Sequence, residues 1–366
     1  MGLTFIDWFA GVGGFRRGME MAGHKCIGFC EFDKYAVASY TSMHLITEEQ
    51  REYLSTLDMK KRQKEILKDE YRNGEWYASD VRTVRAEDIP RADCWCFGFP
   101  CQDISVAGKQ LGFAGHRSSL FFAVTKLIRD TKEEDRPKYL FIENVKNLLS
   151  VNRGFDFAKL LVELDEVGYD AEWSVLNSKD RGVPQNRERV FIIGHLRGRS
   201  GREVFPVEGT DAENRISIIG HRDGYRRNMQ TYSAYGITEA LDTAAGGGRE
   251  FHTAIPVTCN RSECKGETDV AHTLMARDYK GIGNQDMTAV AVRVSGDKEI
   301  YAIWYEKYRC YIAIRKLTPK ECFRLQGWTD DYFEKAEFVN SNSQLYKQAG
   351  NGVTVNVIEA IARKMV

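Results

Sequence analysis

A cysteine and a glutamate each follow an apolar run in this sequence, and together they could act on an electron-poor ring. Cys101 stands directly after Pro100, close behind the apolar run 94–97. Because proline fixes its own backbone, this pair presents a thiol on a stiff segment at the edge of a predicted sheet. Glu143 stands at the end of a second apolar run, 139–142. A thiolate can add to a ring carbon while a carboxyl group holds a ring nitrogen. This pair of residues therefore predicts attack on a pyrimidine.

The Cys101 thiol must lose its proton before it can act as a nucleophile. A free thiol with a pKa of about 8.5 is mostly protonated at neutral pH, so a helix start or an arginine has to lower that pKa, or the proton leaves on attack. The alternative is a buried structural cysteine, the usual fate of a cysteine in an apolar run. That alternative suits Cys94 and Cys96 better than Cys101, which is flanked by Pro100 and the polar Gln102.

A glycine-rich segment, 9–15, follows the first predicted strand and opens a helix. Glycines let a ligand approach the backbone, and a helix N-terminus favours a carboxylate or phosphate. Arg16 stands where the dinucleotide fingerprint requires its third glycine. Glu31, after the second strand, suits ribose hydroxyls, and Asp80, after the third, suits an adenine amino group, although either alone could be a surface acid.

These segments together indicate a nucleoside ligand without a pyrophosphate, and S-adenosylmethionine fits that description. The cofactor contacts that we predict in them are Phe9, Gly11, Val12, Gly13, Gly14, Glu31, Phe32, Asp80 and Val81.

Composition sets weaker limits. The 366 residues are 43% hydrophobic and 28% charged, which is typical of a globular chain with room for one large and one smaller domain. The 52 basic and 52 acidic residues balance, so attraction to a nucleic acid would have to come from local arginine clusters at 197–202 and 222–227. The alternative is that these two clusters are solvated loops. Asp7 interrupts the first apolar stretch, which argues against a signal peptide. No run approaches a membrane span, and the nine cysteines lack zinc spacing, so we expect no metal and a cytoplasmic location.

Strand-like and helical patterns alternate through residues 1–195, which predicts an α/β fold with a doubly wound, mostly parallel sheet and ligand sites at the carboxyl ends of its strands. The predicted strands are Thr4–Phe9, Lys25–Cys30, Asp93–Phe97, Tyr139–Ile142, Glu172–Leu176 and Arg189–Gly194, and the predicted helices include Leu120–Thr131, Phe155–Val167 and Val353–Lys364. Thr47–Tyr71 has helical spacing and predicts a solvated amphipathic helix inserted on the surface, or one that binds a partner.

Glycine, charge and strand-like residues dominate from 196 to about 314, which predicts a smaller, irregular, β-rich domain. We expect a catalytic and cofactor-binding domain at 1–195, a second domain at 196–344, and a C-terminal helix at 345–366 that returns to the first. A weak repeat relates segment 235–248 to segment 270–284, which suggests two similar loop-bearing units.

These motifs, in this order, resemble the DNA cytosine-5-methyltransferase family. The resemblance covers Phe5 to about residue 195, and Arg315 to the end. The matching elements are the glycine segment 9–15, Glu31, Asp80, Pro100-Cys101, Glu143-Asn144-Val145, Gln185-x-Arg187-x-Arg189, Arg315-Lys316-Leu317-Thr318-Pro319, Arg324-Leu325-Gln326-Gly327 and Gln348-Ala349-Gly350-Asn351-Gly352-Val353. Gly352 stands where the family usually has serine, and the insertion at 47–71 lengthens the gap between Glu31 and Asp80.

The resemblance implies S-adenosylmethionine as the cofactor, with S-adenosylhomocysteine as product. The contacts that it implies are Phe9, Glu31, Asp80, Pro100, Leu120, Asn351 and Val353. Residues 196–314 correspond to the family's target-recognition region, in which Thr273-Leu274 looks like the recurring Thr-Leu pair, whereas Asp242-Thr243 in the first repeat copy departs from it.

Cytosine C5 is too poor a nucleophile to take a methyl group directly. Addition of the Cys101 thiolate at C6 would make C5 enamine-like, so that C5 attacks a sulfonium methyl and loss of its proton expels the thiolate. Negative charge builds on N3 and O2, so donors are needed there. A Glu143 whose pKa is raised by burial could share a proton with N3. Of Arg187 and Arg189, alternate residues of an extended segment, one could reach O2 and the other could hold Glu143 or a phosphate, unless both belong to a surface salt-bridge ladder.

We therefore expect methylation of C5 of a flipped cytosine, in a short specific sequence of double-stranded DNA, through a covalent Cys101–C6 adduct. The loop 104–119 could close over the flipped base, or it is an ordinary surface loop. The residues that we expect to contact DNA are Gln102, Ser105, Lys109, Gln110, Arg117, Thr273 and Leu274. We also expect a monomeric bacterial or phage enzyme without membrane contact, paired with a restriction endonuclease.

Other classes remain open. A tRNA cytosine methyltransferase shares this fold, but such relatives carry Cys-Phe-Thr after Glu-Asn-Val, and here Lys146-Asn147-Leu148 follows. A non-catalytic DNA-binding protein would not need Cys101 and Glu143 together. A dinucleotide-dependent oxidoreductase lacks its third glycine, and a thymidylate-synthase-like enzyme would not need the glycine segment with Glu31 and Asp80.

Overall fold

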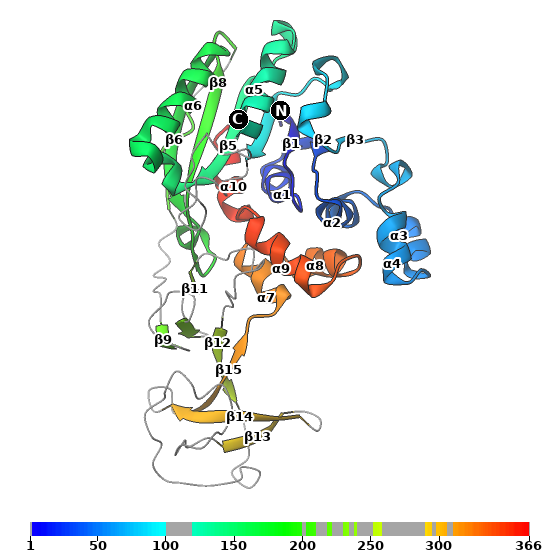
Figure 1. Cartoon of the computed structure of the whole chain (residues 1–366), viewed down its shortest axis with the longest axis vertical. Coiled ribbons are helices and arrows are strands. Elements are labelled where there is room, and N and C mark those ends of the chain that lie inside the picture. Colours follow the sequence, from blue (N-terminus) through cyan, green and yellow to red (C-terminus); the bar gives the residue numbers. More distant parts are fainter. Residues whose placement is uncertain are drawn as a thin grey trace.

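The computed structural model describes residues 2–99, 119–199, 203–209 and 317–365, together with the backbone of several strands between 218 and 316. Its centre is a seven-stranded sheet in the order β3-β2-β1-β4-β5-β8-β6 (Figure 1). The strands are β1 (Thr4–Trp8), β2 (Lys25–Cys30), β3 (Trp76–Ala78), β4 (Cys94–Gly98), β5 (Tyr139–Val145), β6 (Tyr169–Asn177) and β8 (Glu188–Leu196).

The predicted α/β class and the mostly parallel sheet are confirmed. β1 pairs in parallel with β2 and β4, and the parallel pairing continues to β3 and β5. Only β8 departs, running antiparallel between β5 and β6. The order reverses at β1, where the chain leaves for β2 on one side and later returns to β4 on the other. The carboxyl ends of β1 and β4 therefore meet at the switch point, where α/β sheets bind ligands.

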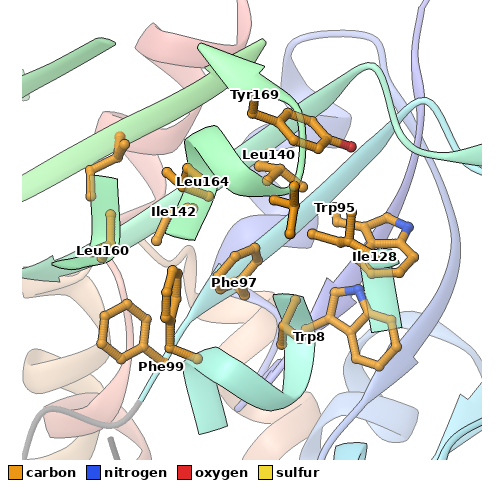
Figure 2. Close-up of a cluster of buried hydrophobic side chains, with 14 of the residues drawn as sticks. Trp8, Trp95, Phe97, Phe99, Ile128, Leu140, Ile142, Leu160, Leu164 and Tyr169 are labelled. Atoms are coloured by element: carbon orange, nitrogen blue, oxygen red, sulfur yellow. The ribbon is translucent and has the colours of Figure 1, made fainter. Parts of the chain in front are cut away.

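Helices cover both faces of the sheet, because side chains of its strands alternate between two apolar cores. Ile6 and Trp8 of β1 pack against α5 (Ser119–Asp130) and α6 (Phe155–Glu166). Figure 2 shows part of that core, with aromatic side chains of β1 and β4 beside aliphatic side chains of α5, β5 and α6. On the other face, Phe5 packs with α1 (Gly14–Met21) and α10 (Val355–Ala362). A Cβ on Gly18 of α1 would stand 2.5 Å from Ile358 Cβ, so the two helices touch.

The insertion at 47–71 is not the single solvated helix that the spacing predicts. It forms two short helices, α3 (Glu48–Ser55) and α4 (Met59–Glu65), followed by a 3₁₀ turn, because Asp58 caps a new helix start through a hydrogen bond from Lys61 N. Its apolar side chains form a small core with Val339. Arg62 donates to the Phe338 carbonyl oxygen (2.7 Å), so the insertion docks on the C-terminal part of the chain.

Four helices close the chain, α7 (Pro319–Leu325), α8 (Asp330–Glu337), α9 (Asn342–Asn351) and α10. The first three share a core with Val12 of the glycine segment and with Met43 of α2 (Lys34–His44). The last helix is shorter than the predicted Val353–Lys364, because residues 352–354 form an extended link between α9 and α10.

A second sheet of six strands, in the order β13-β14-β15-β12-β10-β9, lies beyond α7 (Figure 1). Its strands are β9 (Ile218–His221), β10 (Gln230–Ser233), β12 (His252–Val257), β13 (Val290–Val294), β14 (Lys298–Tyr305) and β15 (Cys310–Lys316). Separately, β11 (Thr238–Glu239) pairs in parallel with β7 (Gln185–Asn186), just before the two arginines of the predicted site. The predicted repeat falls almost wholly outside the described residues, and the domain boundaries stay predictions.

Candidate active site

The glycine segment leaves β1 in left-handed backbone conformations and turns into α1. Phe9, Gly11 and Gly13 all have positive φ, of 55°, 56° and 86°. No atom in the described part of the chain lies within 4 Å of a Cβ built on Gly11, so the backbone there borders open space. Gly13 precedes α1, whose first turn carries no acidic side chain. Within that turn, Arg16 N already donates to the buried Asp7 carboxylate (3.2 Å). The open backbone at Gly11, beside the start of α1, is suited to a further anionic group such as a carboxylate.

Glu31, directly after β2, holds the same segment from the side. Its carboxylate accepts hydrogen bonds from Gly11 N (2.8 Å) and from Asp33 N (2.7 Å). Burial raises the pKa of Glu31 above its usual range, and the two backbone donors act in the opposite direction. Each carboxylate oxygen has a second lone pair, so Glu31 can fix the loop and still accept from a ligand hydroxyl.

Asp80, after β3, lies at the start of a short 3₁₀ turn and is held by Arg82. The guanidinium bonds both carboxylate oxygens, with the shortest N–O distance 2.6 Å, and these bonds lower the pKa of Asp80. The next residue, Val81, is buried in the sheet core, whereas Phe32, beside Glu31, is 74% exposed. Asp80 therefore presents an ionised carboxylate, held by Arg82, just after β3.

The C-terminal link brings a distant part of the predicted cofactor site to the glycine segment. A Cβ on Gly14 would stand 2.7 Å from Val353 Cγ2, so Val353 lies directly against the start of α1. Asn351 ends α9 and is exposed, and Leu120 of α5 packs at the border of the sheet core. The structure thus joins Val353 to the predicted loop across the length of the chain.

Glu143 and Arg189 form an ion pair at the end of β5. Arg189 Nε lies 3.1 Å from Glu143 Oε1, and both side chains are largely buried. In the antiparallel pairing of β5 with β8, Arg189 faces Val145, which brings the arginine beside the end of β5. Burial raises the pKa of Glu143 above its ordinary value of 4.5, although Arg189 and then Arg187 favour the ionised form. A carboxyl group in such surroundings keeps its proton to a higher pH than an exposed glutamate does.

The strand that leads to Cys101 lies directly beside Glu143. Gly98 pairs with Glu143 in the sheet, and a Cβ on Gly98 would stand only 3.1 Å from Glu143 Oε2. Asn144 donates from Nδ2 to the Phe99 carbonyl oxygen (3.1 Å) and so fixes the chain just before Pro100. Asn144 is absent from the site residues predicted from the sequence, although an amide near the end of a largely apolar strand was an available signal.

Arg187 is the second arginine of the predicted pair, of which one was expected to reach O2 and the other to hold Glu143 or a phosphate. It is buried, and its Nη2 donates to the carbonyl oxygens of Gly352 (2.8 Å) and Gly350 (3.4 Å). Arg187 therefore connects the segment before β8 to the end of α9 and to the extended residues that follow it, while Arg189 holds Glu143.

Several predicted site residues lie outside the described residues. They are the nucleophile Cys101, the cofactor residue Pro100, and the DNA residues Gln102, Ser105, Lys109, Gln110, Arg117, Thr273 and Leu274. Among the side chains that are described, no group of three or more His, Cys, Asp or Glu could hold a metal ion. Within the same ranges, no helix has the length and apolar character needed to cross a membrane.

The seven-stranded α/β sheet carries a glycine loop at its switch point and a buried Glu143–Arg189 pair beside β4, the strand that precedes Cys101 in the sequence. These features are those expected of a methyltransferase that acts on cytosine C5. The sequence model for "C-5 cytosine-specific DNA methylase" matches residues 3–366. The chain belongs to this family and is a DNA cytosine-5-methyltransferase.

Curated relatives and solved structures agree with that assignment. The type II methyltransferase M2.ScrFI of Lactococcus lactis subsp. cremoris is 30% identical, and the alignment covers 99% of each chain. The type II methyltransferase M.HhaI of Haemophilus parahaemolyticus is also 30% identical, over 99% of this chain and 93% of that protein. The Entamoeba histolytica methyltransferase EhMeth has the same fold, with a TM-score of 0.63 at 14% identity, covering 100% of this chain and 98% of the other.

Proposed function

We propose that this enzyme transfers a methyl group from S-adenosylmethionine to C5 of a cytosine flipped out of double-stranded DNA, through a covalent bond between Cys101 and C6. The observation that carries the proposal is the buried Glu143, held by Arg189 beside the strand that runs into Cys101. A carboxyl group with a raised pKa at that place can give a hydrogen bond to cytosine N3 while the thiolate attacks the ring.

The residues around the glycine loop fit the proposed cofactor. The open space over Gly11 admits a ligand to the backbone, the start of α1 favours its carboxylate, and Glu31 and Asp80 offer acceptors for ribose hydroxyls and the adenine amino group. Val353 would pack against the ligand from the far side of the loop. When bound, S-adenosylmethionine supplies a methyl group that a carbon nucleophile can take from its sulfonium sulfur.

The protein's own residues act on the base. The Cys101 thiolate forms a bond to C6, and the displaced electron pair is delocalised over C5, N3 and O2. A proton from Glu143 at N3 neutralises part of this charge, and Arg189 keeps Glu143 in position. After C5 is methylated, its proton passes to solvent water, and the electron pair of that C–H bond reforms the C5–C6 double bond. The Cys101–C6 bond breaks to return the thiolate, and N3 returns its proton to the Glu143 carboxylate.

The base must leave the duplex for this attack, because C6 is inaccessible inside the stack. We assign the closing of the site to the loop after Cys101, and the reading of a short target sequence to residues 196–314. Since M2.ScrFI and M.HhaI are type II methyltransferases, we also propose that a cognate restriction endonuclease accompanies this enzyme.

Cytosine methylation mapped by sequencing tests the proposal directly. Unmethylated plasmid DNA is incubated with the protein and S-adenosylmethionine, in parallel with a Cys101→Ser variant and a Cys94→Ser variant as the matched control. We expect 5-methylcytosine within one short motif for the wild type and for Cys94→Ser, and none for Cys101→Ser. Unmodified DNA in every sequence context, from wild-type protein that binds the cofactor, would contradict the proposal and direct attention to tRNA.

A further inference from the structure

The glycine loop is also held by a histidine outside the motifs described above, at a different backbone atom from the one that Glu31 holds. His44 is the last residue of α2, and its Nε2 lies 3.0 Å from the Val12 carbonyl oxygen. A carbonyl oxygen can only accept, so Nε2 carries the hydrogen and donates it. Burial, and next the Arg16 guanidinium, lower the pKa of His44 well below its usual range, so the ring is a neutral donor.

Aromatic rings from two parts of the chain fix the orientation of this imidazole. Its centroid lies 4.9 Å from that of Tyr40 in α2, 5.5 Å from that of Tyr332 in α8, and 6.0 Å from that of Trp328 just before α8. A side chain enclosed in this way has little rotamer freedom, so its hydrogen bond to the Val12 carbonyl is formed without a large further loss of entropy.

The same ring determines which residue can follow Val12. A Cβ on Gly13 would stand 2.5 Å from His44 Nε2, and Gly13 also has a positive φ of 86°. On the near side of the loop, Gly13 N donates to the Ala10 carbonyl oxygen (2.8 Å). The peptide unit between Val12 and Gly13 is therefore bonded at both its oxygen and its nitrogen, and it cannot rotate without breaking one of these bonds.

From these contacts we infer that His44 is a positioning residue for cofactor binding, which acts by fixing the Val12–Gly13 peptide so that the loop backbone is preorganised for the ligand. The inference rests on the proposed function, because it assumes that the ligand of the loop is S-adenosylmethionine. Glu31 fixes the Gly11 nitrogen and His44 fixes the Val12 oxygen, so the loop is held at two backbone atoms. Without the second bond, part of the binding free energy is spent on ordering the loop.

The chain offers a matched control in His24. His24 is buried, its Nε2 lies 3.1 Å from the Ala362 carbonyl oxygen, and its Nδ1 accepts from Leu3 N (3.0 Å). His24 precedes β2, at the amino edge of the sheet, whereas the glycine loop lies at the carboxyl edge. Loss of its hydrogen bonds should lower stability without touching the cofactor site.

The test compares His44→Phe, His44→Gln and His24→Phe in the full-length protein. Calorimetry measures the dissociation constant for S-adenosylmethionine, steady-state assays give KM and kcat with DNA, and thermal unfolding reports stability. Phenylalanine keeps the ring but not the donor, and we expect it to weaken cofactor binding about tenfold, equivalent to one hydrogen bond. KM for the cofactor should rise, with kcat at saturation within about twofold of wild type, as expected when an interaction contributes to binding alone.

The amide of glutamine restores a donor, so His44→Gln should recover most of the affinity. His24→Phe should unfold at a lower temperature and bind the cofactor like wild type. Equal affinity in His44→Phe and wild type would overturn the inference, as would the same loss of affinity in His24→Phe, which would indicate general destabilisation. Wild-type protein that does not bind S-adenosylmethionine at all would instead refute the proposed function.

Discussion

Two glycines of the cofactor loop should respond differently to alanine, because only Gly13 has side chains of the described residues within 4 Å of the position that its Cβ would take. Gly11 and Gly13 both have positive φ, so a Cβ at either position introduces backbone strain of about 1–2 kcal/mol. At Gly13 the new methyl group would also stand 2.5 Å from His44 Nε2 and 3.0 Å from Tyr40 Cε2. Overpacking of this kind costs about 1–3 kcal/mol more.

We therefore expect Gly13→Ala to lower the free energy of unfolding by about 2–5 kcal/mol, and Gly11→Ala by about 1–2 kcal/mol. Gly11→Ala should also weaken cofactor binding, although it costs less stability than Gly13→Ala. The Gly11 methyl group would enter the open space that we assign to the ligand, so Gly11→Ala should weaken binding of S-adenosylmethionine by at least about tenfold, or 1.4 kcal/mol.

Urea unfolding and calorimetric titration of the two variants measure both quantities. Gly74→Ala is a suitable control for strain alone, since Gly74 also has positive φ, no described atom within 4 Å of its Cβ, and no part in the loop. It should match Gly11→Ala in stability and wild type in cofactor affinity. If Gly11→Ala binds S-adenosylmethionine as tightly as Gly74→Ala does, the ligand does not lie over Gly11 and the assignment of the site is wrong.

Three further substitutions test the role of Glu143 and the hydrogen bonds that hold the C-terminal segment beside the site. Glu143→Gln should lower kcat by about 10²–10⁴-fold. Because folding raises the pKa of Glu143, the wild type loses stability as pH rises from about 4.5 through the folded-state pKa, so the melting temperature of the variant relative to that of the wild type should increase over that range. A difference in melting temperature that does not depend on pH would contradict the raised pKa. Arg187→Met removes the charged donor to Gly352 and should lower the free energy of unfolding by about 1.5–3 kcal/mol in urea; unchanged stability would show that this bond is not formed in solution. Gln326→Leu removes the donor to the Ala349 carbonyl oxygen and the acceptor of Thr354 Oγ1, which keeps Ser178 as a partner. It should therefore cost about 1–3 kcal/mol, and unchanged stability measured the same way would refute the described contacts.

Much of the site could be predicted because its residues follow strand ends. Apolar runs of β-type residues identify buried parallel strands, and the first polar residue after each run lies at the carboxyl edge of the sheet. This is why Glu31, Asp80 and Glu143 could be placed on one edge from the sequence alone. The glycines of segment 9–15 were recognisable for a related reason, since only glycine takes positive φ readily.

Contacts between distant segments could not be predicted in this way. Nothing in the local sequence of His44 indicates that its ring meets the Val12 carbonyl, because that contact depends on how α2 packs beside the loop. Arg187 and Arg189 looked equivalent as alternate residues, yet one donates to the Gly352 backbone and the other pairs with Glu143, since the C-terminal link covers only the first.

The insertion shows a limit of a different kind. Helical spacing through 47–71 suggested one amphipathic helix, but the pattern does not reveal where such a helix is interrupted. Asp58 starts a second helix by capping it, and the two short helices then pack their apolar residues around Leu54 and against Val339. Periodicity reports which face is apolar, whereas the break depends on a capping preference at a single residue.

The central claim, that Cys101 adds to cytosine C6 during methyl transfer, is tested most directly by trapping the adduct. Duplex DNA with 5-fluorocytosine at the methylated position cannot lose fluorine as a cation, so elimination of the thiolate is blocked once C5 carries a methyl group. In the presence of S-adenosylmethionine we predict a denaturant-stable protein–DNA complex in which fragmentation mass spectrometry places the modified base on Cys101, and no complex with Cys101→Ser. An enzyme that methylates normal DNA but forms no such complex, or forms it through another residue, would contradict the account.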